Sequence, residues 1–175
     1  MGKTKDSKLG ISSQTSLSQC NVDLKIDELV KDDMIKILAK LNVKFNSEEL
    51  IFVSKDKTCQ IVWLEIGSDR KGLKHILYGN INTKGHLLDF INYFNINEEQ
   101  IIDTIKDVIS NWKVEYSIIV FRNGKEGYER MYSKDDKYMV AGIGVNGFLT
   151  SIYPVHKKDA IKRNRRNIIW KKEKN

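Results

Sequence analysis

The chain has 175 residues, of which 41% are hydrophobic and 30% charged, and this size and composition suit one globular domain with a sizeable core. No run approaches the roughly 18 apolar residues that a membrane span needs, and the first 20 residues contain no apolar signal-peptide stretch. The net charge of +7 lies wholly in residues 156–175, which hold nine Lys or Arg and two acids, so the remaining body is neutral.

The chain divides into three parts by composition. Residues 1–20 are rich in Ser, Thr, Gln and Lys and predict a flexible N-terminal segment. We expect residues 21–155 to form a single α+β domain and residues 156–175 to form a basic C-terminal tail. Cys20 and Cys59 are too few for a disulfide framework and lack metal-ligand spacing, so we expect free thiols and a reducing site of action.

The first two thirds of the domain predict helices with one strand among them. Apolar residues at helical spacing predict an amphipathic helix over 24–41, with a break near Val30. The β-branched run 59–67 predicts a strand that ends in a turn. Helices are expected to follow at residues 69–79, at 85–94 and, after an Asn97 cap, at 98–112.

After residue 112 the apolar period changes from 3.6 to 2, which indicates strands. Asn-Gly pairs at 123–124 and 146–147 predict tight hairpin turns, and Pro154 ends the last strand. The fold class expected is α+β, with N-terminal helices packed on a four-stranded antiparallel meander sheet. The four strands are expected at residues 114–121, 127–133, 138–145 and 147–155.

Sequence motifs of the common cofactor and metal classes are absent. The chain has no nucleotide-binding glycine loop, zinc-site spacing or nucleophile elbow, and GIGVNG predicts a hairpin because no helix follows it. We therefore expect no cofactor and no metal. The residue types that remain suit general acid/base chemistry without a cofactor.

Two histidines are candidates for proton transfer. His75 lies in a helix whose apolar neighbours place it at the edge of the core. It is either a structural histidine with one polar partner or a proton donor or acceptor near neutral pH. His86 opens the following helix, where the helix dipole disfavours its protonated form.

Hydroxyl groups gather on the last strand. By the period of two, Ser151 and Tyr153 share one face, while Thr150 and Ile152 share the other. Two hydroxyls side by side indicate either a polar cleft or a face turned to water.

Arg130 is the candidate cation of the inner strands. It shares a face with Tyr128 and Tyr132, and it is either a fixed phosphate-binding group or an ordinary exposed charge.

Cleavage of RNA by internal transfer, in which the ribose 2′-hydroxyl attacks its own phosphate, needs only groups of these types. His75, Arg130, Ser151 and Tyr153 are the candidate catalytic residues, and His86, Arg122 and Thr150 form a second tier. Phosphate contacts are expected from the cations Lys125, Lys157, Lys158, Lys162, Arg163, Arg165 and Arg166.

Residues 60–155 resemble the barnase/EndoU/colicin/RelE-like (BECR) ribonuclease superfamily. The likeness lies in WLEIGSDRKGLKHIL, with its Gly-Leu-x-His helix, in DFINYFNINEEQIIDTIKDVI, and in the final strand GFLTSIYPV. The resemblance implies that His75 is the helix-borne catalytic histidine and that Ser151 and Tyr153 are the final-strand hydroxyls. It also implies a phosphate-binding cation on an inner strand, for which Arg130 is the choice and Arg122 and Lys125 are substitutes. His86 departs from the spacing of the second histidine in EndoU-like members.

The expected function is a metal-independent endoribonuclease, a toxin domain that cleaves tRNA or other RNA and leaves a 2′,3′-cyclic phosphate. The resemblance implies action in the cytoplasm of a target cell, delivery from a secreted or phage-borne parent protein, and a cognate immunity or antitoxin protein as partner. Two alternatives stay open: a non-catalytic nucleic-acid-binding module, and an immunity or protein-interaction protein. The neutral body counts against a nuclease, because many nucleases spread their cations over the folded surface.

Overall fold

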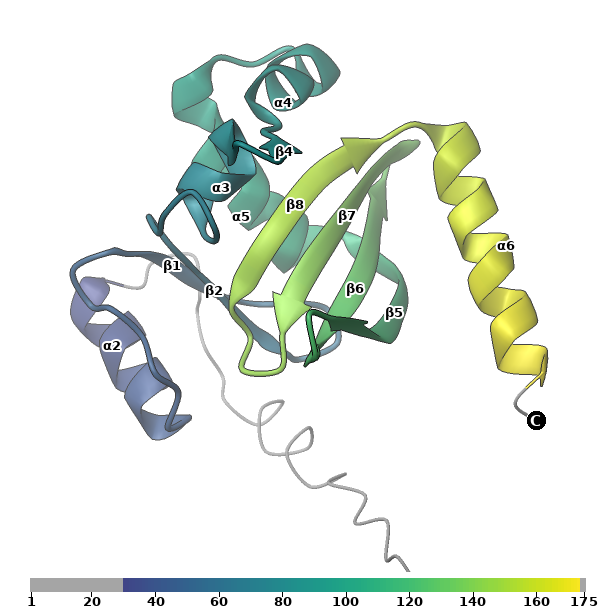
Figure 1. Ribbon diagram of the computed structural model, residues 1–175. Coiled ribbons are helices and arrows are strands. Elements are labelled where there is room, and N and C mark those ends of the chain that lie inside the picture. The colour runs from purple at the N-terminus through teal and green to yellow at the C-terminus, as the bar shows by residue number, and fades with distance from the viewer. Residues whose placement is uncertain (1–29, 174–175) are drawn as a thin grey trace, which may run out of the picture.

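Short helices and strands precede a four-stranded sheet, and one further helix follows it (Figure 1). The computed structural model describes residues 30–173, with side chains to residue 166; the predictions for residues 1–29, Cys20 included, lie outside these residues. The elements are α2 (Lys31–Lys40), β1 (Leu50–Lys55), β2 (Ile61–Glu65), α3 (Leu73–Tyr78), β3 (Gly79–Asn80), β4 (Thr83–Lys84), α4 (Leu87–Phe94), the 3₁₀ helix η2 (Glu98–Gln100), α5 (Ile101–Asn111), β5 (Lys113–Arg122), β6 (Lys125–Lys134), β7 (Lys137–Gly144), β8 (Leu149–Val155) and α6 (Lys157–Glu173).

The α+β class and the four-stranded antiparallel meander are confirmed, with the strand order β5-β6-β7-β8. Asn123 and Gly124 have φ values of 51° and 71°, the left-handed conformations that a two-residue hairpin turn requires. The connection between β7 and β8 differs from the expected two-residue hairpin. It is a longer loop over residues 145–148, in which Gly147 has φ 90°.

The expectation that the helices lie N-terminal to the sheet holds only in part. The segment 50–55 forms β1, a strand that pairs antiparallel with β2 ahead of most of the helices. The basic segment after Val155 is the helix α6, so helices stand on both sides of the sheet in the sequence. The helix expected over 69–79 begins only at Leu73, because Gly72 has φ 80° and residues 68–71 form a turn.

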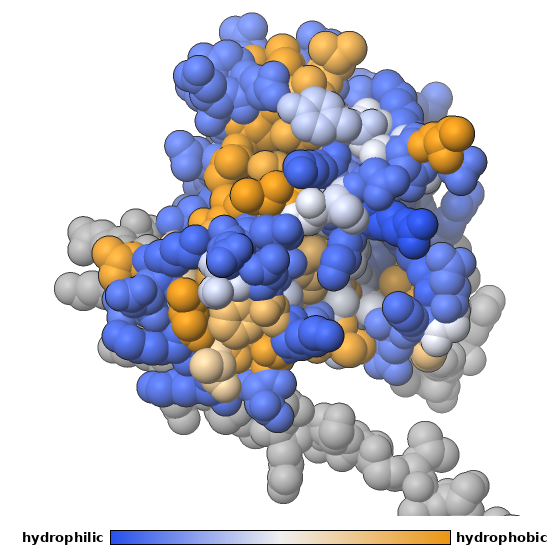
Figure 2. Space-filling view, turned by 60° about the vertical axis from the view of Figure 1, so that its left-hand side comes forward, coloured by the Kyte–Doolittle hydropathy of each residue, from blue (hydrophilic) through white to orange (hydrophobic). Residues whose placement is uncertain are grey.

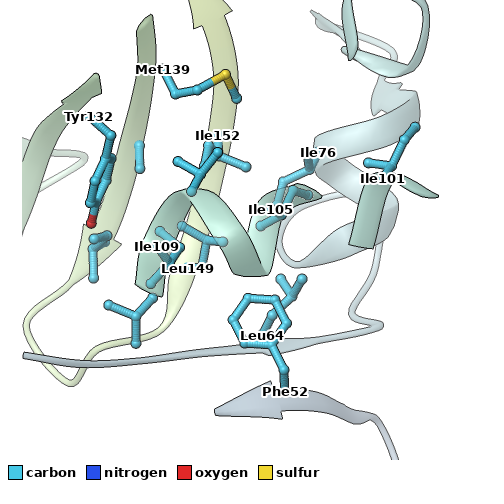
Figure 3. Packing of buried hydrophobic residues seen from close by; sticks show 14 of the residues in the cluster. Phe52, Leu64, Ile76, Ile101, Ile105, Ile109, Tyr132, Met139, Leu149 and Ile152 are labelled. Carbon is cyan, nitrogen blue, oxygen red and sulfur yellow. The ribbon is translucent and has the colours of Figure 1, made fainter. Parts of the chain in front are cut away.

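One face of the sheet packs against α5, and we name it the α5 face. Tyr132, Met139 and Ile152 point from the strands into the main core, where Ile105 and Ile109 of α5 meet them (Figure 3). The helix is well specified locally, because Asn97 and Gln100 form a capping box just before it. Fully burying each such apolar side chain stabilises the fold by about 1.5–3 kcal/mol.

The opposite face meets the first turns of α6, and we name it the α6 face. Met131 and Val140 alternate with the core residues of their strands and pack against Tyr116 and Ala160, all of them buried. Beyond Ala160, α6 stands beside the sheet rather than flat on it (Figure 1). The apolar contact between α6 and this face is therefore short and lies at one end of the sheet.

A second core lies between α2 and the β1–β2 hairpin. Leu38 of α2 and Trp63 of β2 pack there with Phe148 from the loop before β8, and Trp63 donates to the carbonyl of Asn146 at 3.1 Å. The free thiol expected at Cys59, beside this hairpin, is wrong, because Cys59 is disulfide-bonded. The argument for a reducing site of action therefore loses its basis.

The side of the molecule that carries α2, α3 and α4 is mainly hydrophilic, and apolar residues gather in the middle of this side (Figure 2). Ile66, Tyr78, Ile81 and Leu88, which belong to these parts of the chain, are exposed. Among the described helices, none has the length and apolar character that crossing a bilayer requires.

Candidate active site

Two adjacent rows of residues cross the α6 face, with one residue from each strand in each row. The first row is Tyr116, Met131, Val140 and Tyr153, and it is mostly buried. The second row is Ile118, Glu129, Gly142 and Ser151. Directly opposed residues of neighbouring strands have their Cβ positions about 5 Å apart, so Glu129 and Ser151 lie on either side of a residue with no side chain.

Three polar side chains converge above Gly142. A Cβ atom built on this glycine would lie 2.6 Å from Ser151 Oγ, 2.9 Å from Thr150 Oγ1 and 3.6 Å from Arg122 Nη1. The Thr150 hydroxyl donates to the Gly142 carbonyl at 2.9 Å. Ser151 Oγ, in contrast, is buried without a hydrogen-bond partner among the described residues, a state that costs about 1–3 kcal/mol and that a bound ligand would explain.

A β-bulge brings Thr150 to the α6 face. Gly142 pairs with Ser151 and Ile143 pairs with Leu149, so Thr150 is the extra residue of β8. The expectation that Thr150 shares the face of Ile152 is therefore wrong, because the bulge breaks the alternation. The expectation that Ser151 and Tyr153 share one face is confirmed by their register with Gly142 and Val140.

Glu129 is the centre of a charged network on this face. Its carboxylate accepts hydrogen bonds from Tyr116 Oη at 2.9 Å, Arg122 Nη2 at 3.3 Å and Arg163 Nη1 at 3.4 Å. The Glu129 side chain is only 15% exposed. Burial, together with the negative charge of Glu129, raises the pKa of Tyr116 to about 12, so this phenol stays protonated at neutral pH and donates to the carboxylate.

His86 stands at the β8 edge of the same face. Its ring stacks on that of Tyr153 with 4.9 Å between centroids, and Tyr153 Oη accepts from Arg163 Nη2 at 3.4 Å. His86 Nδ1 lies 2.9 Å from a carboxylate oxygen of Asp89, which accepts a hydrogen bond from the ring. This hydrogen bond holds the pKa of Asp89 below its usual value, although burial opposes the shift. The second ring nitrogen is left for another partner, and the side chain is 29% exposed.

A cleft separates α6 from the sheet next to Glu129. It encloses about 410 Å³, and three cations and two carboxylates contribute to its walls. The lining residues are Tyr116, Glu129, Asp159, Lys162, Arg163 and Arg166. A charged and hydrogen-bonding wall of this kind suits an anionic ligand that also brings hydrogen-bond donors.

The structure brings together most of the residues that the sequence singled out. Ser151, Thr150 and Arg122 meet above Gly142, and Tyr153 joins His86 and Arg163 beside them. The second-tier residues His86, Arg122 and Thr150 thus belong to the same surface as the final-strand hydroxyls.

His75 is placed differently. Its Nδ1 lies 2.7 Å from the carbonyl oxygen of Asp69, in the turn that precedes α3. The neighbouring Ile76 and Leu77 pack into the core of the α5 face. Among the contacts of the described residues, none joins His75 to Ser151 or Tyr153.

Arg130 faces away from the candidate site. It lies in register with Ala141 and Ile152 on the α5 face, so the expectation that it acts beside Ser151 and Tyr153 is wrong. The residue is 5% exposed, pairs with Asp56 and donates from Nε to Ser117 Oγ at 2.9 Å. The physical reason is the strand period, because one residue along β6 reverses the direction of the side chain.

The predicted phosphate-binding cations are spread over several surfaces. Lys125 lies exposed at the β5–β6 turn, and Lys157 pairs with Asp136 at 2.8 Å. Lys158 and Arg165 are exposed on α6 and do not line the cleft. Lys162, Arg163 and Arg166 do line it.

Sequence reasoning missed Glu129 and Tyr116. Glu129 stands next to Arg130, and the period of two shows that these neighbours face opposite sides. The sequence does not show which of these two residues points into the core, because that depends on Asp56, the partner of Arg130 in the β1–β2 turn. Tyr116 was hidden by the β5 bulge between Val114 and Tyr116.

Among the described residues, no group of three or more His, Cys, Asp and Glu side chains is placed to hold one metal ion. No protein-family model matches the chain, and no curated protein matches it either. The interpretation of the site therefore rests on its own geometry and chemistry.

Proposed function

We propose that this protein is a metal-independent endoribonuclease whose active site lies on the α6 face, between Glu129 and the His86–Tyr153 pair. The supporting observation is the convergence of Ser151, Thr150 and Arg122 above Gly142, directly beside the carboxylate of Glu129. A phosphodiester fits such a site, because an unpaired hydroxyl and a guanidinium both donate to phosphate oxygens.

The phosphate-binding roles fall to Arg122, Arg163 and Ser151. Each guanidinium carries five N–H donors, and its contacts with Glu129 use only part of them. Arg122 Nη1 and the unpartnered Ser151 hydroxyl lie near the same point above Gly142. Donors fixed in this way stabilise the negative charge that gathers on the phosphorane.

The proton-transfer roles fall to Glu129 and His86. The 2′-oxygen forms a bond to phosphorus, the bond from phosphorus to the 5′-oxygen breaks, and the product carries a 2′,3′-cyclic phosphate. Glu129 takes the proton of the 2′-hydroxyl, and His86 gives a proton to the leaving 5′-oxygen. Asp89 supports this role, because its carboxylate accepts a hydrogen bond from the ring and fixes its orientation.

The resemblance to the BECR ribonucleases supports this proposal, but we assign the role of catalytic histidine to another residue. His86 takes the place expected for His75, because His86 is the one in contact with Tyr153. A toxin of this class would act on tRNA or other RNA in the cytoplasm of a target cell. A cognate inhibitor protein would then cover the α6 face and exclude the RNA.

Cleavage of labelled RNA in the presence of EDTA tests the proposal. The intact protein should yield 2′,3′-cyclic phosphate ends, and Glu129→Gln and His86→Ala should each lower the rate by about 10²–10⁴-fold, because each removes a proton-transfer group. His75→Ala is the matched control, since its ring forms a hydrogen bond with the turn before α3 and none with Ser151 or Tyr153 among the described residues. It should leave the rate within about threefold of the intact protein, below the range of a lost acid or base.

Two results would count against this assignment. Loss of cleavage in His75→Ala with full activity in His86→Ala would return the role to the helix-borne histidine. Failure of the intact protein to cleave any RNA, tRNA included, would remove the nuclease proposal itself.

A non-catalytic nucleic-acid-binding module is the second candidate. It is favoured by the three hydrogen bonds that Glu129 already accepts, two from β5 and one from α6, because a carboxylate engaged in this way suits a structural role. Binding without turnover, with a steep salt dependence that disappears when residues 156–175 are deleted, would select this candidate.

A further inference from the structure

Some cations of α6 line the cleft and others do not. Asp159, Lys162, Arg163 and Arg166 line the cleft, and their spacing of three, four and seven residues places them on one side. Lys158 and Arg165 are exposed and absent from the cleft wall. The tail is therefore a helix with a defined cationic row rather than a diffuse positive charge.

Two members of this row have no ion pair among the residues that the structure describes. Arg163 is engaged by Glu129 and Tyr153. Lys162 and Arg166 form no ion pair with any carboxylate in the described part of the chain, although both border a cleft that contains Asp159. Unpaired cations at the rim of a cleft attract an anion more strongly than cations already held in ion pairs.

We propose that the cleft between α6 and the sheet is a subsite for a second phosphate, next to the scissile one, on a single-stranded polynucleotide. This inference rests on the proposed ribonuclease function, because it takes Arg122, Arg163 and Ser151 as the groups that hold the scissile phosphate. Lys162 and Arg166 bind the neighbouring phosphate, and the strand runs along α6 from the Gly142 position.

The size of the cleft selects one strand. A volume of about 410 Å³ lies near the lower end of the range for small organic ligands, which suits about one nucleotide unit. Double-stranded RNA is instead recognised across wide grooves over many base pairs. A cleft of this size admits an unpaired nucleotide but not a duplex.

The mixture of charges selects a nucleotide rather than an acidic peptide. Glu129 and Asp159 accept hydrogen bonds, and a nucleotide brings ribose hydroxyls and base amino groups as donors together with its phosphate. The carboxylates of an acidic peptide would meet these two acids with like charge. A ligand that carries an anionic group beside hydrogen-bond donors can bind both the cations and the carboxylates that line the cleft.

Binding of a labelled single-stranded DNA of about 12 nucleotides tests the subsite independently of turnover, because DNA lacks the attacking 2′-hydroxyl. Lys162→Gln with Arg166→Gln in the full chain should raise Kd about tenfold. It should also make the plot of log binding constant against log salt shallower by about 0.7, the value for one lost single-strand phosphate contact.

Lys158→Gln with Arg165→Gln is the matched control, since it removes the same charge from the same helix outside the cleft. It should change Kd by less than about threefold, a fraction of the effect of a lost charged hydrogen bond. Circular dichroism and thermal unfolding of both double variants should match those of the intact chain, which separates lost contacts from a displaced helix.

If the two double variants weaken DNA binding equally, the attraction is diffuse and the subsite is overturned. If neither variant weakens DNA binding, the subsite is overturned as well. Tight binding through Lys162 and Arg166 in a protein that cleaves no RNA would uphold the phosphate subsite and remove the nuclease proposal. If the protein cleaves RNA and the cleft variant has an unchanged KM, the nuclease proposal is upheld and the phosphate subsite is removed.

Discussion

Ser151 is the single residue whose environment departs furthest from what stability alone would produce. Its hydroxyl is buried and has no hydrogen-bond partner in the described part of the chain, whereas alanine at this position would bury no polar group. The neighbouring Thr150 differs, because its hydroxyl is satisfied by the Gly142 carbonyl. A group that destabilises the free protein and persists in an otherwise paired site is suited to a ligand.

Opposite effects on stability and activity are therefore expected at Ser151. Ser151→Ala should leave the free energy of unfolding unchanged or raise it by up to about 1 kcal/mol, because it removes an unsatisfied buried group. The same change should lower RNA cleavage at least about tenfold, because a donor to the phosphate is lost. Urea unfolding and the EDTA cleavage assay measure the two quantities.

Thr150→Val supplies the comparison for this prediction. It should lower the free energy of unfolding by about 1 kcal/mol, since it breaks a hydrogen bond that is made in the free protein. A clear loss of stability in Ser151→Ala would mean that its hydroxyl has a structural partner and would contradict the phosphate role.

At the scale of elements, a buried ion pair ties the β1–β2 hairpin to the sheet. Asp56 is 3% exposed, and besides Arg130 it accepts hydrogen bonds from the backbone of Thr58 and Gln60 at 2.8 and 3.1 Å. One carboxylate thus closes the hairpin turn and neutralises an arginine of β6. Asp56 could not be singled out from the sequence, because its partner lies 74 residues away.

Asp56→Asn isolates the charge of this pair, because asparagine keeps an oxygen for the turn. The variant should lose about 3–5 kcal/mol of stability, since Arg130 would stay buried without a counter-charge. Urea unfolding followed by fluorescence measures the loss. The RNA cleavage rate below the unfolding transition should stay close to that of the intact protein, because Arg130 lies on the α5 face.

The exposed pair of Lys36 and Asp33, with 71% and 46% of their side chains accessible, provides the control. Lys36→Ala should change stability by less than about 1 kcal/mol. An equally small change in Asp56→Asn would mean that the Arg130 charge is balanced by water or by another group.

At the scale of the whole molecule, the sheet has one face that builds the core and one that carries polar chemistry. Helices α3, α4 and α5 cover the α5 face, and α6 stands over the α6 face. The proposed acid, base and phosphate-binding groups come from three strands, β5, β6 and β8, and from the start of α4 and the body of α6.

Expression in bacterial cells tests the proposed function of the intact molecule. We expect growth arrest by the intact chain and by His75→Ala, and normal growth with Glu129→Gln or His86→Ala, because only the last two lose proton-transfer groups. Matched protein levels on immunoblots make the comparison valid. Arrest by all four proteins would point to toxicity without catalysis and would contradict the assigned roles.

By itself, the sequence determined the class of the fold, the four strands and the position of α5, because local periodicity, Asn-Gly turns and the Asn97 cap act over a few residues. It also indicated the hydroxyls of β8 and the cations after Val155. Only the tertiary structure decided that Arg130 is a buried partner of Asp56 and that Glu129 faces the candidate site. It likewise decided that a bulge turns Thr150 to that site and that His86 meets Tyr153. The reason is physical: strand register, bulges and long-range ion pairs depend on contacts between segments far apart in the chain.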